Sequence, residues 1–264
     1  MVIAATWLWV TACNALWGLD QLDYQSSGAG GSAAGGAQGG AGGATSSGGG
    51  TGGGGLGGQG GQGGDPYVWC DEPNLIACFE FEGSAVDGSL VQHQGTAVDV
   101  SYVPGVVGQA AAFGPNGRVW VAPHATLSPA VVTIELWVRF ASLPVSSARM
   151  GLFDNPSRFG LFLYANGFRC SANSASIELS GSVPQVNEWT HVACTNDGTT
   201  ITLFVNGQPT ASGASVPLIT DPSSQPAAIG SDEPPGDYLN GAIDQFRLFA
   251  VVRTAEQIAQ AATF

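Results

Sequence analysis

The stretch Asn187–Gln208, NEWTHVACTNDGTTITLFVNGQ, predicts two antiparallel β-strands and the tight turns that bound the second of them. In Trp189–Thr195, successive side chains fall on opposite faces, with Trp189, His191 and Ala193 on one and Thr190, Val192 and Cys194 on the other. This is the period-2 pattern of a half-buried strand. Asp197-Gly198 supplies the first turn, and Ile201–Val205 is a β-branched and aromatic run. Asn206-Gly207 favours a second turn because both residues tolerate positive φ. The stretch therefore places the fold in the antiparallel β class.

Four further stretches, together with this one, resemble the laminin-G-like, concanavalin-A-like jelly-roll domains, in the order in which that family has them. They are ACFEFEGSAVDGS (77–89), PGVVGQAAAFG (104–114), TIELWVRF (133–140) and YLNGAIDQFRLF (238–249). The resemblance covers Cys70 to the C-terminus and implies an all-β antiparallel sandwich. Thr254 and Gln257 form a capping-box pattern that predicts a short terminal helix over Ala255–Ala261. The family spans lectin-like, adhesive and enzyme-appended modules, so its fold does not by itself give a function.

Two segments of different composition precede the expected jelly-roll domain at residues 65–264. Ser27–Gly64 is almost entirely Gly, Ala, Ser, Thr and Gln, with no charge and no aromatic residue. Such a segment cannot bury enough apolar surface to offset its chain entropy. We therefore predict that residues 14–64 form a disordered tether, and a Gly-rich coil of the length of Ser27–Gly64 has a root-mean-square span of about 35 Å.

The first 13 residues, MVIAATWLWVTAC, are mostly apolar and end in Val10-Thr11-Ala12-Cys13. This ending resembles a bacterial lipoprotein processing box, which implies a signal peptide and a lipid on Cys13. No Asp follows Cys13, so we expect an exported protein anchored at the bacterial outer membrane or cell surface. The segment lacks the basic residues that usually open a signal peptide, so we expect the natural start to lie further upstream. A buried or disordered apolar start is the alternative, and the segment is too short to span a bilayer.

The charge balance is strongly acidic. The chain has 20 acidic residues against 7 arginines, no lysine, and a formal net charge of −13. A chain with so few cations is a poor binder of nucleic acid or of an anionic membrane surface. We therefore expect no nucleic-acid partner, contact with a membrane only through the lipid anchor, and a monomer.

Four cysteines remain when Cys13 is set aside. An even number of cysteines in an exported chain favours disulfides. Of the three possible connectivities, we favour Cys70 with Cys78 and Cys170 with Cys194. A zinc site is the alternative, but the sequence offers no Cys-x-x-Cys pair and no histidine at ligand spacing.

Acidic residues in two of the family-like stretches predict a structural calcium ion. Asp244 is expected to share a strand face with Phe246 and Leu248, and a buried carboxylate needs donors or a cation. The resemblance implies calcium where the final strand meets the acidic loop, with Asp244, Glu82, Asp87 and backbone oxygens near Gly83 as ligands. Hydrogen bonding of the Asp244 side chain to turn amides, and solvated acidic caps at Glu82 and Asp87, are the alternatives.

The stretch VVTIELWVRF presents two faces. Alternation assigns Ile134, Leu136, Val138 and Phe140 to the core. The opposite face carries Glu135, Trp137 and Arg139, an aromatic ring between an acid and a base, which is typical of a sugar- or peptide-binding surface. An ordinary exposed sheet with cross-strand pairs is the alternative.

Catalysis is disfavoured by the residues that the central strands offer. A glycoside hydrolase needs two carboxylates facing each other across the scissile bond, whereas Glu135 and Glu178 are isolated acids. We therefore expect a non-catalytic module that binds a glycan or a surface protein. An adhesion scaffold is the second hypothesis and a hydrolase the third. The long loops PVSSARMGLFDNPSRFG (144–160) and ITDPSSQPAAIGSDEPPGDY (219–238) match no motif that specifies a ligand.

Overall fold

The computed structural model describes residues 69–173, 175–176 and 183–263. The predicted signal segment, the lipidation site Cys13 and the tether lie outside the described residues. Thirteen strands, one 3-10 helix and one α-helix follow one another along the described part of the chain. They are β1 (Leu75–Phe79), β2 (Gly95–Pro104), β3 (Gln109–Val121), η1 (Ala125–Leu127), β4 (Val132–Phe140), β5 (Arg149–Asn155), β6 (Phe159–Tyr164), β7 (Gly167–Ala172), β8 (Ala175–Ser176), β9 (Trp189–Asn196), β10 (Thr200–Val205), β11 (Gln208–Ala214), β12 (Ala227–Ile229), β13 (Gly241–Phe249) and α1 (Ala255–Ala261).

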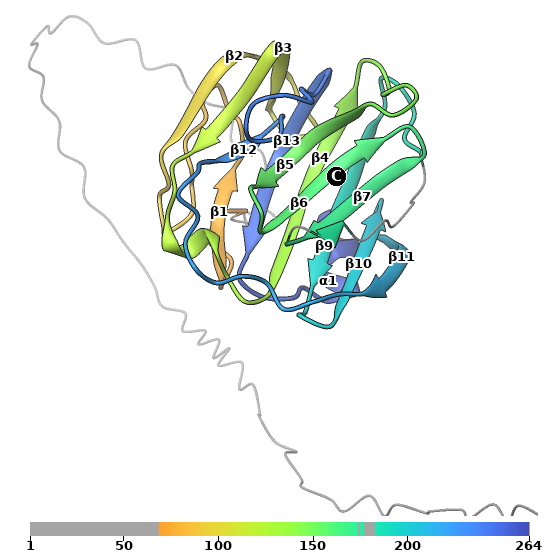
Figure 1. Ribbon diagram of the computed structural model, residues 1–264. Helices are drawn as coiled ribbons and strands as arrows, with labels where there is room; N and C mark the ends of the chain where they lie inside the picture. Colours follow the sequence, from red (N-terminus) through yellow and green to blue (C-terminus); the bar gives the residue numbers. More distant parts are fainter. Residues whose placement is uncertain (1–68, 174, 177–182, 264) are drawn as a thin grey trace, which may run out of the picture. The chain divides into compact units, whose positions relative to one another are not determined.

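The strands form one long antiparallel ladder that curls into two layers. The order is β11-β10-β9-β4-β13-β3-β12-β5-β6-β7-β8, with β1 on β13 and β2 on β3. In Figure 1 the strands β5, β6 and β7 lie in front of β4 and β9. The disulfide Cys170–Cys194 joins β7 to β9, with a Cα–Cα distance of 6.1 Å, and so connects the layers. The predicted all-β sandwich with a short C-terminal helix is confirmed.

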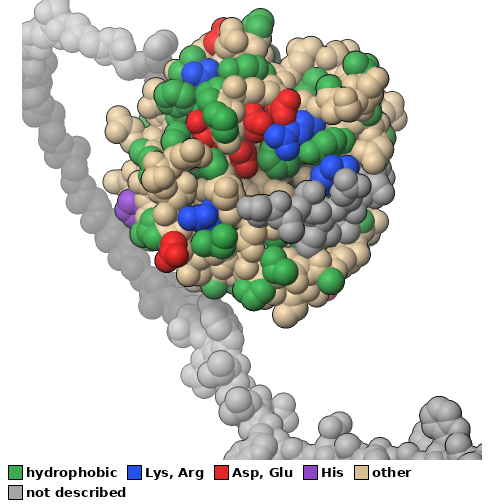
Figure 2. All heavy atoms as spheres, viewed as in Figure 1, with side chains coloured by type: hydrophobic (Ala, Val, Ile, Leu, Met, Phe, Trp, Pro, Cys, Tyr) green, Lys and Arg blue, Asp and Glu red, His purple; other side chains and the backbone are tan. Residues whose placement is uncertain are grey.

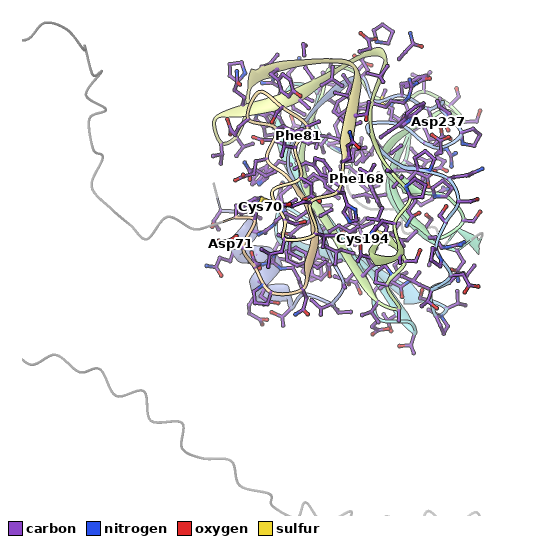
Figure 3. The ribbon with its side chains drawn as sticks, turned by 90° about the vertical axis from the view of Figure 1, so that its left-hand side faces the viewer. Cys70, Asp71, Phe81, Phe168, Cys194 and Asp237 are labelled. Atoms are coloured by element: carbon purple, nitrogen blue, oxygen red, sulfur yellow. A yellow bond between two sulfur atoms is a disulfide. The ribbon has the colours of Figure 1, made fainter. Side chains whose placement is uncertain are left out.

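Alternating side chains fill the space between the layers. Ile134, Leu136, Val138 and Phe140 of β4 are fully buried, as their alternation predicts. The ring of Phe140 lies 6.0 Å from that of Phe168 on β7, centroid to centroid, and Figure 3 shows Phe168 in the interior. Each such side chain contributes about 1.5–3 kcal/mol by its burial.

The hairpin predicted from residues 187–208 is present as β9 and β10. Ile201 pairs with Asn196 and Val205 with Val192. Asn206 and Gly207 adopt φ of 48° and 74°, as a tight hairpin turn requires. A Cβ on Gly207 would lie 2.9 Å from the Cα of Ala259. Glycine is therefore needed there both for its backbone conformation and for the approach of α1.

The terminal helix α1 covers part of the outer side of the β9–β10 layer. Thr254 and Gln257 form both hydrogen bonds of the predicted capping box. Ile258 packs with Ala193 and Phe204 in a small cluster of buried side chains. In the described part of the chain, no helix is both long and apolar enough to cross a membrane.

One strand departs from the simple alternation used in the sequence analysis. The register of β13 against β4 shifts between Asp244 and Arg247, where Gln245 adopts a φ of 50°. Asp244 pairs with Trp137 and therefore lies on the outer face, because directly paired residues share a face. The prediction that Asp244 shares a face with Phe246 and Leu248 is wrong, since a bulge re-aims its side chain.

Candidate functional site

The outer face of β5, β6 and β7 carries a polar cleft. Leu161 and Leu163 of β6 point into the core, so Gly160, Phe162 and Tyr164 face outward. The cleft has a volume of about 250 Å³, and Figure 2 shows acidic and arginine side chains gathered over this face. We call it the polar cleft. Its lining consists of Arg149, Asp154, Ser157, Phe162, Tyr164, Arg169, Ser171, Asn173, Asp232 and Glu233.

The loop 230–237 forms one wall of the polar cleft. The amide of Gly151 donates to the carbonyl of Asp237 at 2.7 Å. A Cβ on Gly151 would lie 2.3 Å from the carbonyl carbon of Ser231, so the loop lies directly against β5. The amide of Glu233 donates to Oδ2 of Asp154 at 2.9 Å. These contacts bring the Asp232 and Glu233 side chains to the carboxylate of Asp154.

Two arginines are held in the polar cleft by carboxylates and aromatic rings. Arg149 pairs with Asp232, Nη2 to Oδ2 at 2.7 Å, and with Asp237 through Nε. Its guanidinium lies 4.8 Å from the ring centroid of Phe162. The guanidinium of Arg169 lies 3.7 Å from the ring centroid of Tyr164. Stacking of this kind fixes the position of a guanidinium.

The carboxylates of the polar cleft have raised pKa values because they are partly buried. Burial raises the pKa of Asp154 to about 6, although the hydrogen bond from the Glu233 amide opposes the rise. Burial also raises the pKa values of Asp232 and Glu233. Oδ1 of Asp232 and Oε2 of Glu233 are buried and accept no hydrogen bond from any described residue. The cleft thus places two fixed guanidinium groups beside partly buried carboxylates.

A second group of residues surrounds the loop 105–109 at the bulge of β13. Oδ2 of Asp244 accepts hydrogen bonds from the amides of Val106 at 2.7 Å and Val107 at 3.1 Å. A Cβ on Gly105 would lie 2.3 Å from that oxygen, so only glycine allows the loop to approach. Oε2 of Glu82 accepts from the amide of Gln109 at 3.0 Å. The loop therefore brings Asp244 and Glu82, which are far apart in sequence, to one place.

These residues fit a calcium ion in part. Burial raises the pKa of Asp244 to about 6, and the nearby charge of Glu82 adds to the rise. Oδ1 of Asp244 is buried and has no partner among the residues that the structure describes. Gly83, with a φ of 71°, follows Glu82. The described chain groups no three His, Cys, Asp or Glu side chains as a metal site, so a calcium ion here would need backbone carbonyls besides the two carboxylates.

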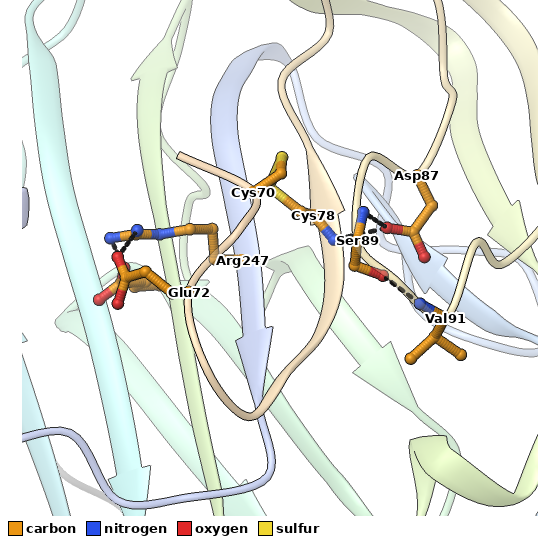
Figure 4. The surroundings of a disulfide bond; sticks show 8 residues. Cys70, Glu72, Cys78, Asp87, Ser89, Val91 and Arg247 are labelled. Atoms are coloured by element: carbon orange, nitrogen blue, oxygen red, sulfur yellow. Dashed lines mark hydrogen bonds and ion pairs between the residues drawn. A yellow bond between two sulfur atoms is a disulfide. The ribbon is translucent and has the colours of Figure 1, made fainter. Parts of the chain in front are cut away.

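Asp87 has a different role from the one predicted for it. Its Oδ1 accepts hydrogen bonds from the amides of Cys78 at 2.8 Å and Ser89 at 2.9 Å, and its Oδ2 accepts from the amide of His93 at 2.8 Å. Figure 4 shows the hydrogen bonds from Cys78 and Ser89 beside the disulfide Cys70–Cys78, which is confirmed with a Cα–Cα distance of 5.6 Å. Three amides occupy both oxygens, so Asp87 anchors its own loop instead of joining Asp244 as a ligand.

The face of Glu135, Trp137 and Arg139 is largely covered, which corrects the expectation of an exposed binding surface. Glu135 is fully buried and Trp137 is 7% exposed. Glu135 pairs with Arg247 and with Arg253, the latter at 2.7 Å. Burial raises the pKa of Glu135, against the opposing effect of the two arginines.

The cover comes from the two ends of the described domain. Glu72 pairs with Arg247, as Figure 4 shows, and with Arg253 at 3.2 Å. The ring of Trp69 lies 3.5 Å from the guanidinium of Arg247. Arg139 alone of the three predicted residues keeps substantial exposure, and its guanidinium lies 4.9 Å from the ring centroid of Trp189.

The polar cleft was not predicted from the sequence. Its charged residues lie mostly in or beside the two long loops that match no motif, and the pairing of β12 with β5 brings those loops together. One signal was available on β6, where Gly160, Phe162 and Tyr164 alternate with the core residues of the strand. Alternation alone does not distinguish a binding face from any other exposed face.

Comparisons with known proteins agree with this architecture. Residues 113–259, more than half of the chain, match the family described as the concanavalin A-like lectin/glucanases superfamily. A search of curated proteins found no match.

Three solved structures illustrate the similarity of the fold. Each of the three matches covers 72% of this chain. Domain 4 of an extracellular arabinanase of Geobacillus stearothermophilus, solved with arabinotriose, is 18% identical, with a TM-score of 0.60 over 98% of its length. The binding domain of Paraclostridial mosquitocidal protein 1 is 16% identical, with a TM-score of 0.61 over 52% of its length. A botulinum neurotoxin type C structure, whose description gives interaction with two ganglioside molecules, is 16% identical, with a TM-score of 0.56 over 51% of its length. With its fold and its sequence in agreement, the chain belongs to the concanavalin A-like lectin/glucanases superfamily.

Proposed function

We propose that the domain is a non-catalytic binding module that recognises a glycan in the polar cleft. The observation that carries this proposal is the set of charged, hydroxyl, amide and aromatic side chains that line a recess of about 250 Å³. A sugar presents several hydroxyl groups, each both donor and acceptor, together with an apolar ring face. Arg169, Ser171 and Glu233 bring a guanidinium, a hydroxyl and a carboxylate to this lining, and Tyr164 brings an aromatic ring.

The comparisons support a sugar ligand. Among the structural neighbours, one arabinanase domain was solved with arabinotriose and one neurotoxin is described with gangliosides. At such low identity, what these proteins share with this chain is the fold alone. The choice of sugar therefore depends on the cleft residues of this protein.

The absence of catalysis is part of the proposal. A glycoside hydrolase needs one carboxyl group free to donate a proton and a second free to attack or to activate water. Asp232 is tied to Arg149, and Asp154 accepts the amide of Glu233. Both carboxylates therefore serve to shape the cleft.

We also propose a structural calcium ion between Asp244 and Glu82, completed by backbone oxygens near Gly83. The unpartnered Oδ1 of Asp244 supports this proposal, because a buried carboxylate oxygen with no donor is costly. The ion would hold the loop 105–109 against β13. Thermal unfolding with millimolar calcium and with a chelator tests it: we expect a higher melting temperature with calcium, lost in Asp244→Asn. An equal melting temperature in both buffers would contradict it.

Export with a lipid anchor at Cys13 is a further proposal. The two disulfides fit an extracellular or secreted domain, because such bonds persist in oxidising compartments. Labelling of the full-length chain with a palmitate analogue should mark the wild type and not Cys13→Ser. Equal labelling of both, or of neither, would contradict the anchor.

A glycan array on the full chain tests the glycan-binding proposal. We expect a small set of related glycans to bind, and Arg169→Gln to weaken binding of the best of them by about tenfold or more, since it removes a charged donor. Arg158→Gln is the matched control, because that guanidinium donates to the carbonyl of Asp221 and does not line the cleft. A blank array would contradict the proposal and favour a protein partner. Equal losses in both variants would contradict the assignment to the cleft.

A further inference from the structure

A second recess lies on the outer side of the layer that contains β3, β13 and β4. Its volume is about 330 Å³, and we call it the Arg139 pocket. Ala242 of β13 pairs with Ala112 of β3 on one side and with Arg139 of β4 on the other. The three side chains therefore form one row on the same face. Two alanines beside a long arginine leave the recess open.

The floor of the pocket is formed by closely packed backbone. A Cβ on Gly241 would lie 2.2 Å from the carbonyl oxygen of Arg139. The chain therefore tolerates no side chain at this point, and the two strands lie close together. The floor consists of methyl groups and backbone, a surface onto which an apolar ring face can lie.

The guanidinium of Arg139 is available to a ligand. It donates no hydrogen bond to any described residue and pairs with none of the described carboxylates, whereas Arg149, Arg247 and Arg253 are all in salt bridges. Within the described ranges it stacks on Trp189, with its central carbon 4.9 Å from the ring centroid. The ring holds the charged group in place while its five donors remain unused by the described chain.

Two amide side chains flank this cation. Asn187 lies in the turn before β9, where its backbone amide donates to the carbonyl of Phe140 at 2.8 Å. Nδ2 of Asn240 donates to Oγ of Ser142 at 2.7 Å, which leaves the Asn240 Oδ1 as an acceptor. Both residues line the pocket. An amide offers both donors and an acceptor, which suits hydroxyl groups.

We infer that the Arg139 pocket binds the carboxylate of an acidic sugar. A planar guanidinium accepts a carboxylate through two parallel hydrogen bonds. The asparagine amides then form hydrogen bonds with the hydroxyl groups of the same sugar, and the alanine side chains contact its apolar face. The inference uses none of the residues of the polar cleft, so the two sites stand or fall separately.

Titration calorimetry on the full chain tests the inference, with trigalacturonic acid as the acidic probe and galactotriose as the neutral one. We expect saturable binding of trigalacturonic acid that weakens as salt is raised, and much weaker binding of galactotriose. Arg139→Gln should weaken the binding of trigalacturonic acid by about 10- to 100-fold, the range expected for a charge-assisted hydrogen bond. Arg158→Gln is the matched control and should bind as the wild type does.

Several results would overturn the inference. They are the absence of saturable binding, equal affinity for galactotriose, or unchanged affinity in Arg139→Gln. A loss in Arg169→Gln in place of Arg139→Gln would put the ligand in the polar cleft and overturn the assignment to this pocket. Equal affinity for a tri-aspartate peptide would overturn the assignment to a sugar. If Arg139→Gln fails to fold, Arg139→Lys decides: it keeps the charge, loses the paired geometry, and should weaken binding by a smaller factor.

Discussion

Glu135 has no exposed surface and lies between the guanidinium groups of Arg247 and Arg253. Removal of one partner from such a group leaves uncompensated buried charge, which costs about 3–5 kcal/mol. Glu135→Gln should therefore lower the free energy of unfolding, measured with urea, by about 3 kcal/mol or more. Glu256→Gln on the exposed side of α1 is the control and should change it by less than about 0.5 kcal/mol. Equal effects would contradict the network.

The pH dependence of stability is a second prediction at this scale. The pKa of Asp154 is raised from 3.8 to about 6 in the folded protein, so folding favours its protonated form. Its contribution is fully present below about pH 4 and is lost as the pH rises through 6. Such a shift is worth up to about 3 kcal/mol. Without calcium, wild-type stability should fall between pH 4 and 7 more steeply than that of Asp154→Asn. Parallel curves would contradict this prediction.

Sequence alternation placed β4 correctly but did not show what covers its outer face. Glu135 has the pattern of an exposed strand residue, but its partners are Arg247 and Arg253 near the end of the domain. Glu72 at the start of the domain pairs with the same two arginines. No local pattern records a contact over such separations. Asp244 is buried, as expected, but on the outer face beside the loop 105–109 and not on the strand face that alternation assigned to it.

The turn at Gly207, between β10 and β11, packs against α1. Gly207→Ala adds a side chain where φ is 74° and where the Cα of Ala259 would lie 2.9 Å away. We expect a loss of about 2–3 kcal/mol, from backbone strain and from displacement of α1. Gly198→Ala separates the two causes, because its φ is 88° and its Cβ would lie 3.8 Å from Pro217. Thermal unfolding should show the larger loss in Gly207→Ala, and equal losses would contradict a packing role.

The ends of strands and helices were predictable where residues typical of turns or helix caps occur. The Asn206-Gly207 turn and the Thr254–Gln257 capping box both occur as predicted. The bulge at Gln245 was not predictable, because β13 changes its neighbour there from β3 to β1. That change of partner is a property of the whole sheet, and it places Asp244 beside the loop 105–109.

For the whole molecule, the disulfide Cys170–Cys194 connects the two layers across 24 residues of sequence. Loss of a loop constraint of this size costs about 3 kcal/mol in the chain-entropy model. The double variant Cys170→Ala, Cys194→Ala should therefore lower the free energy of unfolding by about that amount in guanidinium titration. The Cys70→Ala, Cys78→Ala variant closes a shorter loop and should lose less. The reverse order would contradict the account.

The fold of the whole domain was predictable because five family-like stretches occur in order, whereas the polar cleft was not. The cleft arises from loops that the ladder β12-β5-β6-β7 brings together, and loops carry the specificity of such scaffolds. The measurement that tests the glycan-binding account most directly is a crystal structure of the protein soaked with the best glycan from the array. The account predicts a sugar ring in the polar cleft, in contact with Arg169 and Tyr164. A glycan bound elsewhere, with the cleft unoccupied, would contradict it.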